Sequence, residues 1–97
     1  MFFVYILRSV QVDIFYVGHT DDLAKRIREH QTGRSPYTRT RGPWELVHVE
    51  VFSTRAEAMK REREIKSRKS RRYIETLVKE SNGKWRLFLS EKDDRVG

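Results

Sequence analysis

The sequence predicts a small single-domain α/β fold, in which helices flank a three-stranded sheet that is mixed or antiparallel. The chain of 97 residues is long enough for one domain with a modest core. Three short apolar runs are rich in β-branched and aromatic residues, as strands are. Three further stretches begin with capping residues and carry apolar stripes, as amphipathic helices do. The expected order β, β, α, β, α, α packs these helices on the sheet.

The first two strands are expected at residues 2–7 and 14–18, joined as a hairpin. A turn centred between Val10 and Gln11 would set Tyr5 directly opposite Tyr16, with both phenols on one face. The segment between the strands contains no Gly, Pro or Asn to form a tight turn. On composition alone, the two phenols would be amphipathic packing in the core.

Thr20 is the expected N-cap of a helix over residues 21–31, which ends at Gly33. A basic loop over residues 34–43 follows, and Trp44 opens the third strand. Regular alternation along this strand gives two faces, Leu46, His48, Glu50 and Phe52 on one and Val47, Val49 and Val51 on the other. The histidine in this strand is interpreted as a packing or surface residue.

Thr54 and Glu57 have the spacing of a capping box, which predicts a helix through about residue 67. Its expected core residues are Ala58 and Ile65. A further helix is expected over about residues 70–79, which completes a domain at residues 1–80. Residues 81–97 form a C-terminal tail, in which alternating apolar residues suggest a short added strand: Trp85, Leu87 and Leu89.

Two triplets, Phe3-Val4-Tyr5 and Tyr16-Val17-Gly18, resemble the signature of the GIY-YIG nuclease superfamily, although Phe3 stands where Gly is common. Arg26, His30 and Glu62 follow in the order of the family's motifs. The loop over residues 36–44 and the later Ile65-Lys66 are most similar to small stand-alone bacterial members of YhbQ type. The resemblance covers roughly residues 2–78, and the ordered set is more specific than either triplet.

The resemblance implies a GIY-YIG-like domain that acts as a divalent-metal-dependent DNA endonuclease. Tyr16 would be the general base or would orient the attacking water, with Tyr5 as its partner. Arg26 would stabilise the phosphate, and His30 would assist proton transfer or contact the phosphate. Glu62 would hold one Mg²⁺ or Mn²⁺ ion.

The residues by themselves leave plainer alternatives open. Arg26 and His30 are four residues apart and so share a helix face, which could simply be solvated. Glu62 has the spacing of an i,i+4 ion-pair partner for Lys66.

Charge favours a polyanionic partner, because 21 basic residues against 14 acidic ones give a net charge of +7. Residues 55–72 hold nine basic and three acidic residues, and such a run could also be a solvated helix face. The expected nucleic-acid contacts are His19, Arg34, Tyr37, Arg39, Arg41, Lys66, Arg68, Lys69, Arg71 and Arg72. DNA is the expected substrate, and RNA stays open as an alternative.

The sequence also argues against several classes of protein and site. It contains no Cys, which excludes disulfides and cysteine-based zinc sites. The apolar start lacks a basic leading segment and is interrupted by Arg8, so neither a signal peptide nor a membrane span is expected, and the protein is expected to be cytoplasmic.

Two alternatives remain beside a structure-directed nuclease of DNA repair or recombination. One is a non-catalytic nucleic-acid-binding module. The other is a basic interaction protein within a larger assembly. No base-reading motif is evident, so specificity would come from the shape of the DNA or from a protein partner that targets the enzyme.

Overall fold

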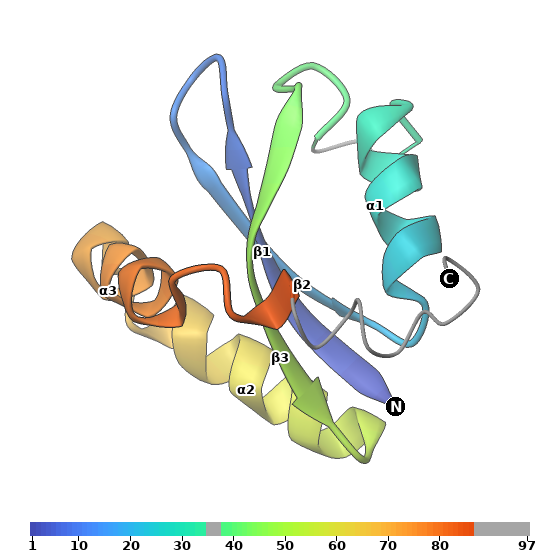
Figure 1. The fold of residues 1–97 in the computed structure, drawn as a ribbon, viewed down its shortest axis with the longest axis vertical. Helices are drawn as coiled ribbons and strands as arrows, with labels where there is room; N and C mark the ends of the chain where they lie inside the picture. The colour runs from blue at the N-terminus through green and yellow to red at the C-terminus, as the bar shows by residue number, and fades with distance from the viewer. Residues whose placement is uncertain (35–37, 87–97) are drawn as a thin grey trace.

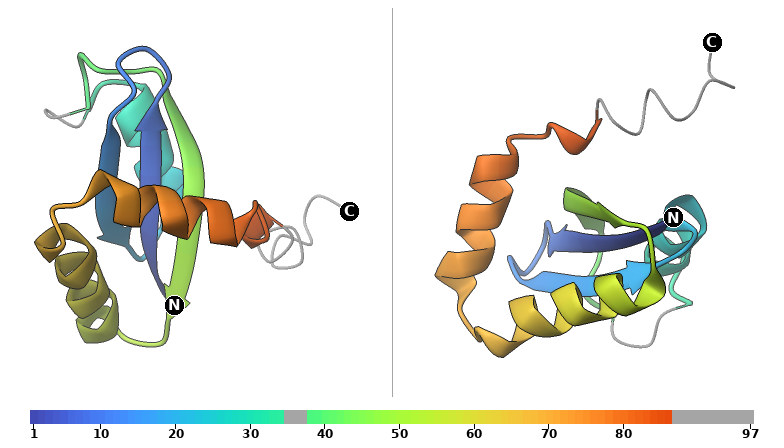
Figure 2. Two further views of the ribbon diagram at one scale, coloured as in Figure 1. Left: turned by 90° about the vertical axis from the view of Figure 1, so that its left-hand side faces the viewer. Right: turned by 90° about the horizontal axis from the view of Figure 1, so that it is seen from below.

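The computed structural model describes residues 1–34 and 38–86 of the chain. Its elements are β1 (Phe2–Ser9), β2 (Phe15–Thr20), α1 (Leu23–Gln31), β3 (Trp44–Phe52), α2 (Arg55–Ser67) and α3 (Arg71–Ser81). The strands form one antiparallel sheet in the order β2-β1-β3 (Figure 1). Helix α1 covers one face, whereas α2 and α3 pack on the other (Figure 2). The predicted fold class and element order are confirmed.

The core lies on both sides of the central strand β1. Val4 and Ile6 point toward α2, where they meet Ala58 and Ile65, and all four side chains are at most 1% exposed. The alternate residues Tyr5 and Leu7 point toward α1 and are equally buried. A strand buried on both faces explains why residues 2–7 are apolar without interruption. It also places the phenol of Tyr5 inside the protein.

The register of the hairpin differs from the prediction. Tyr5 pairs with Gly18, and Tyr16 pairs with Leu7. The reason is the turn, which spans residues 10–13 because the Ser9 N–H donates to the Ile14 carbonyl over 2.8 Å. Asp13 takes a positive φ of 54°, which an aspartate tolerates better than most residues. A shift of two residues preserves the face, so the two phenols remain neighbours, with ring centroids 6.2 Å apart.

Gly18 is required by the packing of Tyr5 across the strand pair. A Cβ atom at position 18 would lie 2.6 Å from the phenol oxygen of Tyr5 and 3.1 Å from the Tyr16 ring. The phenol therefore occupies the space that any other residue would need. The glycine of the second triplet is therefore needed to let the Tyr5 ring pack across β2.

The alternation predicted for β3 is wrong at one point. The pairing with β1 jumps from His48 opposite Ile6 to Leu46 opposite Leu7, which leaves Val47 as a bulge. The extra residue changes the faces of the strand's first half. Leu46 consequently packs with the cluster on the α1 side, and Val47 packs on the side of α2 and α3.

The helix ends follow capping chemistry. Asp22, rather than the predicted Thr20, caps α1 by accepting the Lys25 N–H, and Thr20 Oγ1 accepts the N–H of Asp22. The predicted capping box of α2 is confirmed, with Thr54 and Glu57 satisfying each other's backbone groups. No helix in the described part of the chain is long and apolar enough to cross a membrane.

Of the residues expected in an added C-terminal strand, only Trp85 lies within the described chain. Helix α3 runs to Ser81, and Trp85 follows in a further helical turn. The Trp85 indole N–H donates to the Val47 carbonyl over 3.2 Å, so the ring packs beside the bulge of β3. Leu87 and Leu89 lie outside the described residues.

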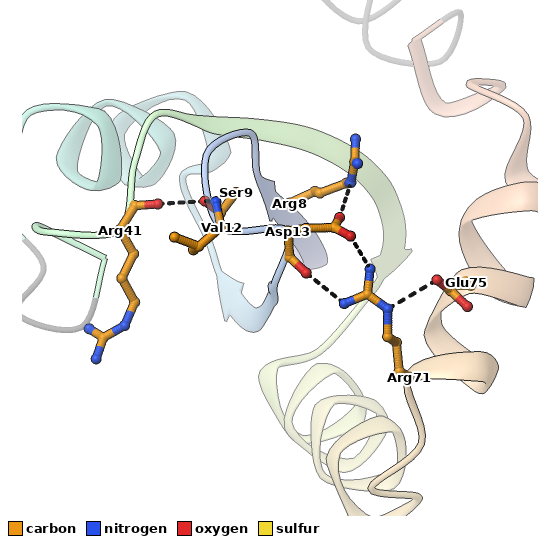
Figure 3. Close-up of polar contacts among 7 residues, drawn as sticks. All are labelled: Arg8, Ser9, Val12, Asp13, Arg41, Arg71 and Glu75. Carbon is orange, nitrogen blue, oxygen red and sulfur yellow. Dashed lines mark hydrogen bonds and ion pairs between the residues drawn. The ribbon is translucent and has the colours of Figure 1, made fainter.

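The hairpin turn is tied to two distant segments (Figure 3). Ser9 Oγ donates to the carbonyl of Arg41 over 2.6 Å. On the other side, Arg71 donates to the Asp13 carbonyl over 2.6 Å and to its carboxylate over 2.9 Å. Hydrogen bonds from Arg8 and Arg71 hold the pKa of the Asp13 carboxyl below its ordinary value. The start of α3 is thereby fixed against the hairpin turn, just before β2 begins.

We expect Gly18→Ala to destabilise the fold, because the new Cβ must displace the Tyr5 ring. Overpacking of this kind costs about 1–3 kcal/mol. Urea denaturation measures the change, and Tyr5→Leu provides the matched background. The alanine should cost much less where the ring is absent, and equal costs in both backgrounds would show that the phenol is not the obstacle.

Candidate active site

A buried hydrogen-bonded chain begins at the phenol of Tyr5. Tyr5 Oη lies 2.8 Å from His30 Nε2, and His30 Nδ1 lies 2.8 Å from Thr38 Oγ1. All three residues are at most 2% exposed. Tyr5 comes from β1, His30 from the last turn of α1, and Thr38 from the loop before β3. The chain joins three segments of the protein through polar groups that have no access to water.

Burial fixes the protonation states of this chain. It raises the pKa of the Tyr5 phenol, and the neighbouring Tyr16 raises it further. Burial, followed by the positive charge of Arg26, lowers the pKa of His30 to about 4. At neutral pH the phenol is protonated and the imidazole is neutral. The Tyr5 O–H can then donate to Nε2 while the N–H at Nδ1 donates to Thr38.

Tyr16 stands beside this chain but is less buried. Its ring meets His30 edge-on, with centroids 4.8 Å apart, and it also contacts Trp44 at 6.4 Å. The residue is partly buried, whereas Tyr5 is almost fully enclosed. Of the two predicted tyrosines, Tyr16 is therefore the one within reach of an external molecule.

Arg26 supplies a cation to the same cluster. Its guanidinium donates to Glu29 Oε1 over 2.9 Å, and this bond is the main reason that the pKa of Arg26 is raised. Both phenols, Tyr5 and Tyr16, add to that shift, so the guanidinium lies in their immediate surroundings. The Arg26 side chain remains 33% exposed. The cation is oriented, yet accessible to an anion.

Glu62 approaches from the other face of the sheet. Its Oε1 lies 2.5 Å from His19 Nδ1 on β2, and its Oε2 accepts from Lys66 Nζ over 2.6 Å. Burial raises the pKa of this carboxyl, but hydrogen bonds from Lys66 and His19 outweigh burial and hold the pKa below its ordinary value. Glu62 is thus ionised at neutral pH. Burial and Tyr16 are the larger causes of the raised pKa of the Tyr5 phenol, and the charge of Glu62 adds to them.

The strand β2 explains how the two halves meet. It forms an edge of the sheet, so side chains from its two faces can converge around that edge. Tyr16 points to the α1 side, and His19 points to the α2 side, where it holds Glu62. The five residues predicted as catalytic, Tyr5, Tyr16, Arg26, His30 and Glu62, are therefore gathered around one strand.

The predicted nucleic-acid contacts divide into several places. His19 and Lys66 are bound to Glu62 and so lie in the candidate site itself. Arg34, Arg39 and Arg41 follow α1, and Tyr37 lies outside the described residues. Lys69 and Arg72 are exposed, and the guanidinium of Arg68 lies over the Tyr73 ring, 4.5 Å from its centroid. Arg71 is held by Asp13 and Glu75, which makes it a structural cation.

Three contacts of the site were not predicted from the sequence: those of His19 with Glu62, Thr38 with His30, and Glu29 with Arg26. The signal for His19 was its alternation with Val17, which puts both on the face opposite Tyr16. Glu29 had the i,i+3 spacing from Arg26. The contact of Thr38 with His30 had no local signal, because it depends on how the loop returns over α1.

Glu62 is the side chain that could hold a metal ion. No group of three or more His, Cys, Asp or Glu within residues 1–34 and 38–86 has the arrangement of a metal site. A single ionised carboxylate suits Mg²⁺ or Mn²⁺, since such ions keep much of their coordination for water and substrate oxygens. The donor set therefore fits a weakly held hard cation that shares its coordination with a phosphate.

Comparisons with known proteins identify the family of the chain. A family model described as the GIY-YIG catalytic domain matches residues 1–75. A UPF0213 protein of Natronomonas pharaonis is 44% identical over 82 residues, which cover 84% of this chain and 94% of the relative. A UPF0213 protein of Haloquadratum walsbyi is 47% identical over 66 residues, or 67% of this chain and 73% of the relative.

A solved structure is also similar. The solution NMR structure of the UPF0213 protein BH0048 from Bacillus halodurans matches with a TM-score of 0.55 at 40% identity, over 88% of this chain and 90% of that one. The match supports the architecture of a three-stranded sheet with helices on both faces. The family model spans all five residues of the candidate site.

We expect the pH dependence of stability to report the buried imidazole. The pKa of His30 is about 4 in the folded protein, against an ordinary value of 6.5. The unfolded chain therefore takes up a proton before the folded protein does. The contribution of neutral His30 to the free energy of unfolding should be complete above about pH 6.5. It should be lost progressively as the pH falls toward 4.

Urea denaturation of the wild type and His30→Gln at several pH values measures this contribution. The variant should have a lower stability at neutral pH, since Tyr5 loses a well-placed partner, and a shallower fall between pH 6.5 and 4. An unchanged slope in the variant would assign the pH dependence to other groups.

Proposed function

The chain belongs to the family of GIY-YIG catalytic domains, a nuclease family, and from this premise we propose that it is a divalent-metal-dependent endonuclease that hydrolyses phosphodiester bonds of DNA. The observation that supports this most is the convergence of a phenol, a guanidinium and a carboxylate around β2, in the side chains of Tyr16, Arg26 and Glu62. Phosphodiester hydrolysis needs a positioned water and positive charge around the developing pentacovalent phosphate. The three groups can supply these needs together.

Tyr16 is the proposed base or water-orienting group. Its ring is fixed against His30 and Trp44, and it is less buried than Tyr5. Arg26 is the proposed phosphate ligand, because a guanidinium can bind two phosphate oxygens at once and Glu29 already holds it in place. As negative charge develops on the phosphate, the guanidinium would stabilise it without large rearrangement.

Tyr5 and His30 are proposed as positioning residues. Both nitrogens of His30 already have partners, and the ring is 2% exposed, so it is poorly placed to contact the phosphate directly. Its contacts instead fix the phenol of Tyr5 and the edge-on position of Tyr16. This differs from the role in proton transfer that the family resemblance implied for His30.

Glu62 is the proposed ligand of Mg²⁺ or Mn²⁺, and Lys66 would have to yield to the ion. When bound, the ion would polarise the phosphate and stabilise the negative charge of the leaving oxygen. The Lys66 ammonium lies 2.6 Å from Glu62 Oε2 and its side chain is 52% exposed, so it can swing into solvent. His19 would keep the carboxylate oriented through its other oxygen.

Binding of DNA is proposed to depend on exposed basic residues of α2 and α3 and to be nearly independent of sequence. The residues available for phosphate contacts are Lys60, Arg63, Lys66, Lys69 and Arg72. Arg61 and Arg71 contribute less, because Glu50 and Asp13 respectively hold them. Selection of a cleavage site would then depend on the structure of the DNA or on a protein partner.

Glu62→Gln should separate cleavage from binding. The amide keeps the size of the side chain but removes the charge, so we expect cleavage to fall by more than about 100-fold. DNA binding should stay equal or become slightly tighter, since a negative charge has left the surface. The measurement is gel analysis of labelled duplex, nicked, branched and single-stranded DNA with Mg²⁺, Mn²⁺ or EDTA.

Glu64→Gln is the matched control, because Glu64 lies on the same helix and pairs with Arg61 instead. It should cleave like the wild type. If the wild type cleaves none of these substrates with either metal, or if Glu62→Gln cleaves normally, the nuclease proposal is wrong. The chain would then be better described as a nucleic-acid-binding module.

Lys66→Met should lower the metal concentration needed for half-maximal cleavage. Removing the ammonium frees Glu62 Oε2 from a competing cation. The expected decrease is roughly two- to fivefold, the range for breaking an exposed ion pair. Titration with Mg²⁺ at saturating DNA measures it, with Lys60→Met as a control for the loss of an exposed charge from α2. An unchanged or higher requirement for metal would contradict the competition.

A further inference from the structure

Figure 1 shows β2 at one edge of the sheet, with α2 and α3 on one of its faces. A groove lies between residues of β2 and residues at the end of α2 and the start of α3. Its volume is about 580 Å³. The apolar walls come from Ile14, Phe15 and Val17 on one side and from Ile65 and Ile74 on the other. We call this the β2 groove. Its volume lies within the roughly 300–1,000 Å³ that is usual for sites that enclose small molecules.

Positive charge surrounds these apolar walls. Lys66, Lys69 and Arg71 line the β2 groove, and no acidic residue of the described chain does so. Arg71 is anchored to Asp13 on the hairpin turn (Figure 3) and lies over the Phe15 ring, 5.0 Å from its centroid, so it forms a fixed wall. Lys69 is exposed, which leaves its ammonium available to a ligand. The groove therefore complements a molecule with a flat apolar body and an anionic group.

The β2 groove is continuous with the candidate active site. Tyr16 lines the groove and also belongs to the catalytic cluster. At the other side, Lys66 lines the groove and contacts Glu62. A smaller cavity of about 170 Å³ beside Glu62 shares Lys66 with it. Adjacent parts of one molecule could therefore occupy the groove and the candidate site at the same time.

We propose that the β2 groove receives an unpaired base of the nucleic-acid strand, next to the phosphate that is cleaved. A base has apolar faces suited to Phe15 and the isoleucines, and its flanking phosphates suit the two lysines. Bases stacked inside a duplex are not available to such a groove unless they are extruded. The preferred substrate class is therefore DNA with unpaired nucleotides. This inference rests on the proposed function for the identity of the neighbouring phosphate.

Binding without cleavage tests the inference separately from the nuclease proposal. The probes are a fluorescein-labelled blunt DNA duplex and the same duplex with a single-stranded extension, titrated with the full chain in EDTA and followed by anisotropy. The wild type should bind the extended duplex about tenfold more tightly, within the range for stacking of one base on an aromatic side chain.

Ile14→Trp fills the β2 groove with an indole and should bring the affinity for the extended duplex down to that for the blunt one. Val12→Trp is the matched control. Val12 lies two residues away on the hairpin turn, is 50% exposed and does not line the groove. It should keep the preference for the extended duplex.

A second pair of variants tests the charged rim without filling the groove. Lys69→Gln should weaken binding of the extended duplex more than binding of the blunt one. Lys79→Gln removes the same charge from an exposed position of α3 outside the groove and should leave the preference unchanged. Circular dichroism of each variant verifies the fold, and the glutamine pair decides the matter if the tryptophan variant is misfolded.

Equal affinity of the wild type for both duplexes would overturn the inference, as would a preference that survives both Ile14→Trp and Lys69→Gln. Addition of a peptide strand to the edge of β2 would also use this groove, but it predicts no dependence on unpaired bases. If the preference is present but no metal supports cleavage, the base site stands and the nuclease proposal fails. If cleavage occurs without the preference, the reverse holds.

Discussion

The structure depends on burying a phenol at the centre of a sheet that is covered on both faces. A hydroxyl removed from water must be paired, and Tyr5 finds its partner in His30 of α1. His30 in turn contacts Thr38, whose carbonyl accepts the Trp44 indole N–H over 2.9 Å. One polar group on β1 thus determines how α1, the following loop and the start of β3 close over that face.

The sequence predicted the elements better than their alignment. The runs around Tyr5 and Tyr16 identified strands because both burial and β-propensity favour that conformation. Their register could not be read, since it depends on a turn stabilised by Ser9 and on the positive φ of Asp13 rather than on a glycine. The bulge at Val47 had no sequence signal and exchanged the faces of half a strand.

The candidate site shows the same division. Its five residues were identified by family resemblance, whereas helical spacing alone left Arg26 and Glu62 as ordinary surface residues. What decides their surroundings is contact between distant segments, such as that of His19 with Glu62, 43 positions apart. Charge was also read incompletely. A run of basic residues looks uniform in sequence, but Arg61 is paired with Glu50 and Arg71 with Asp13. Fewer basic residues are therefore available to an external anion than the sequence suggests.

The arrangement of the sheet edges has a consequence for self-association. A free strand edge presents unpaired backbone groups that can join the sheet of another molecule, which is a common route to aggregation. On β3, the strand is irregular at the Val47 bulge, and the Val47 carbonyl accepts a hydrogen bond from the Trp85 indole. On β2, Lys66 and Lys69 stand beside the edge, so two copies that approach there meet like charges. The positive charge that favours a polyanion at this surface therefore disfavours pairing with a second copy of the chain.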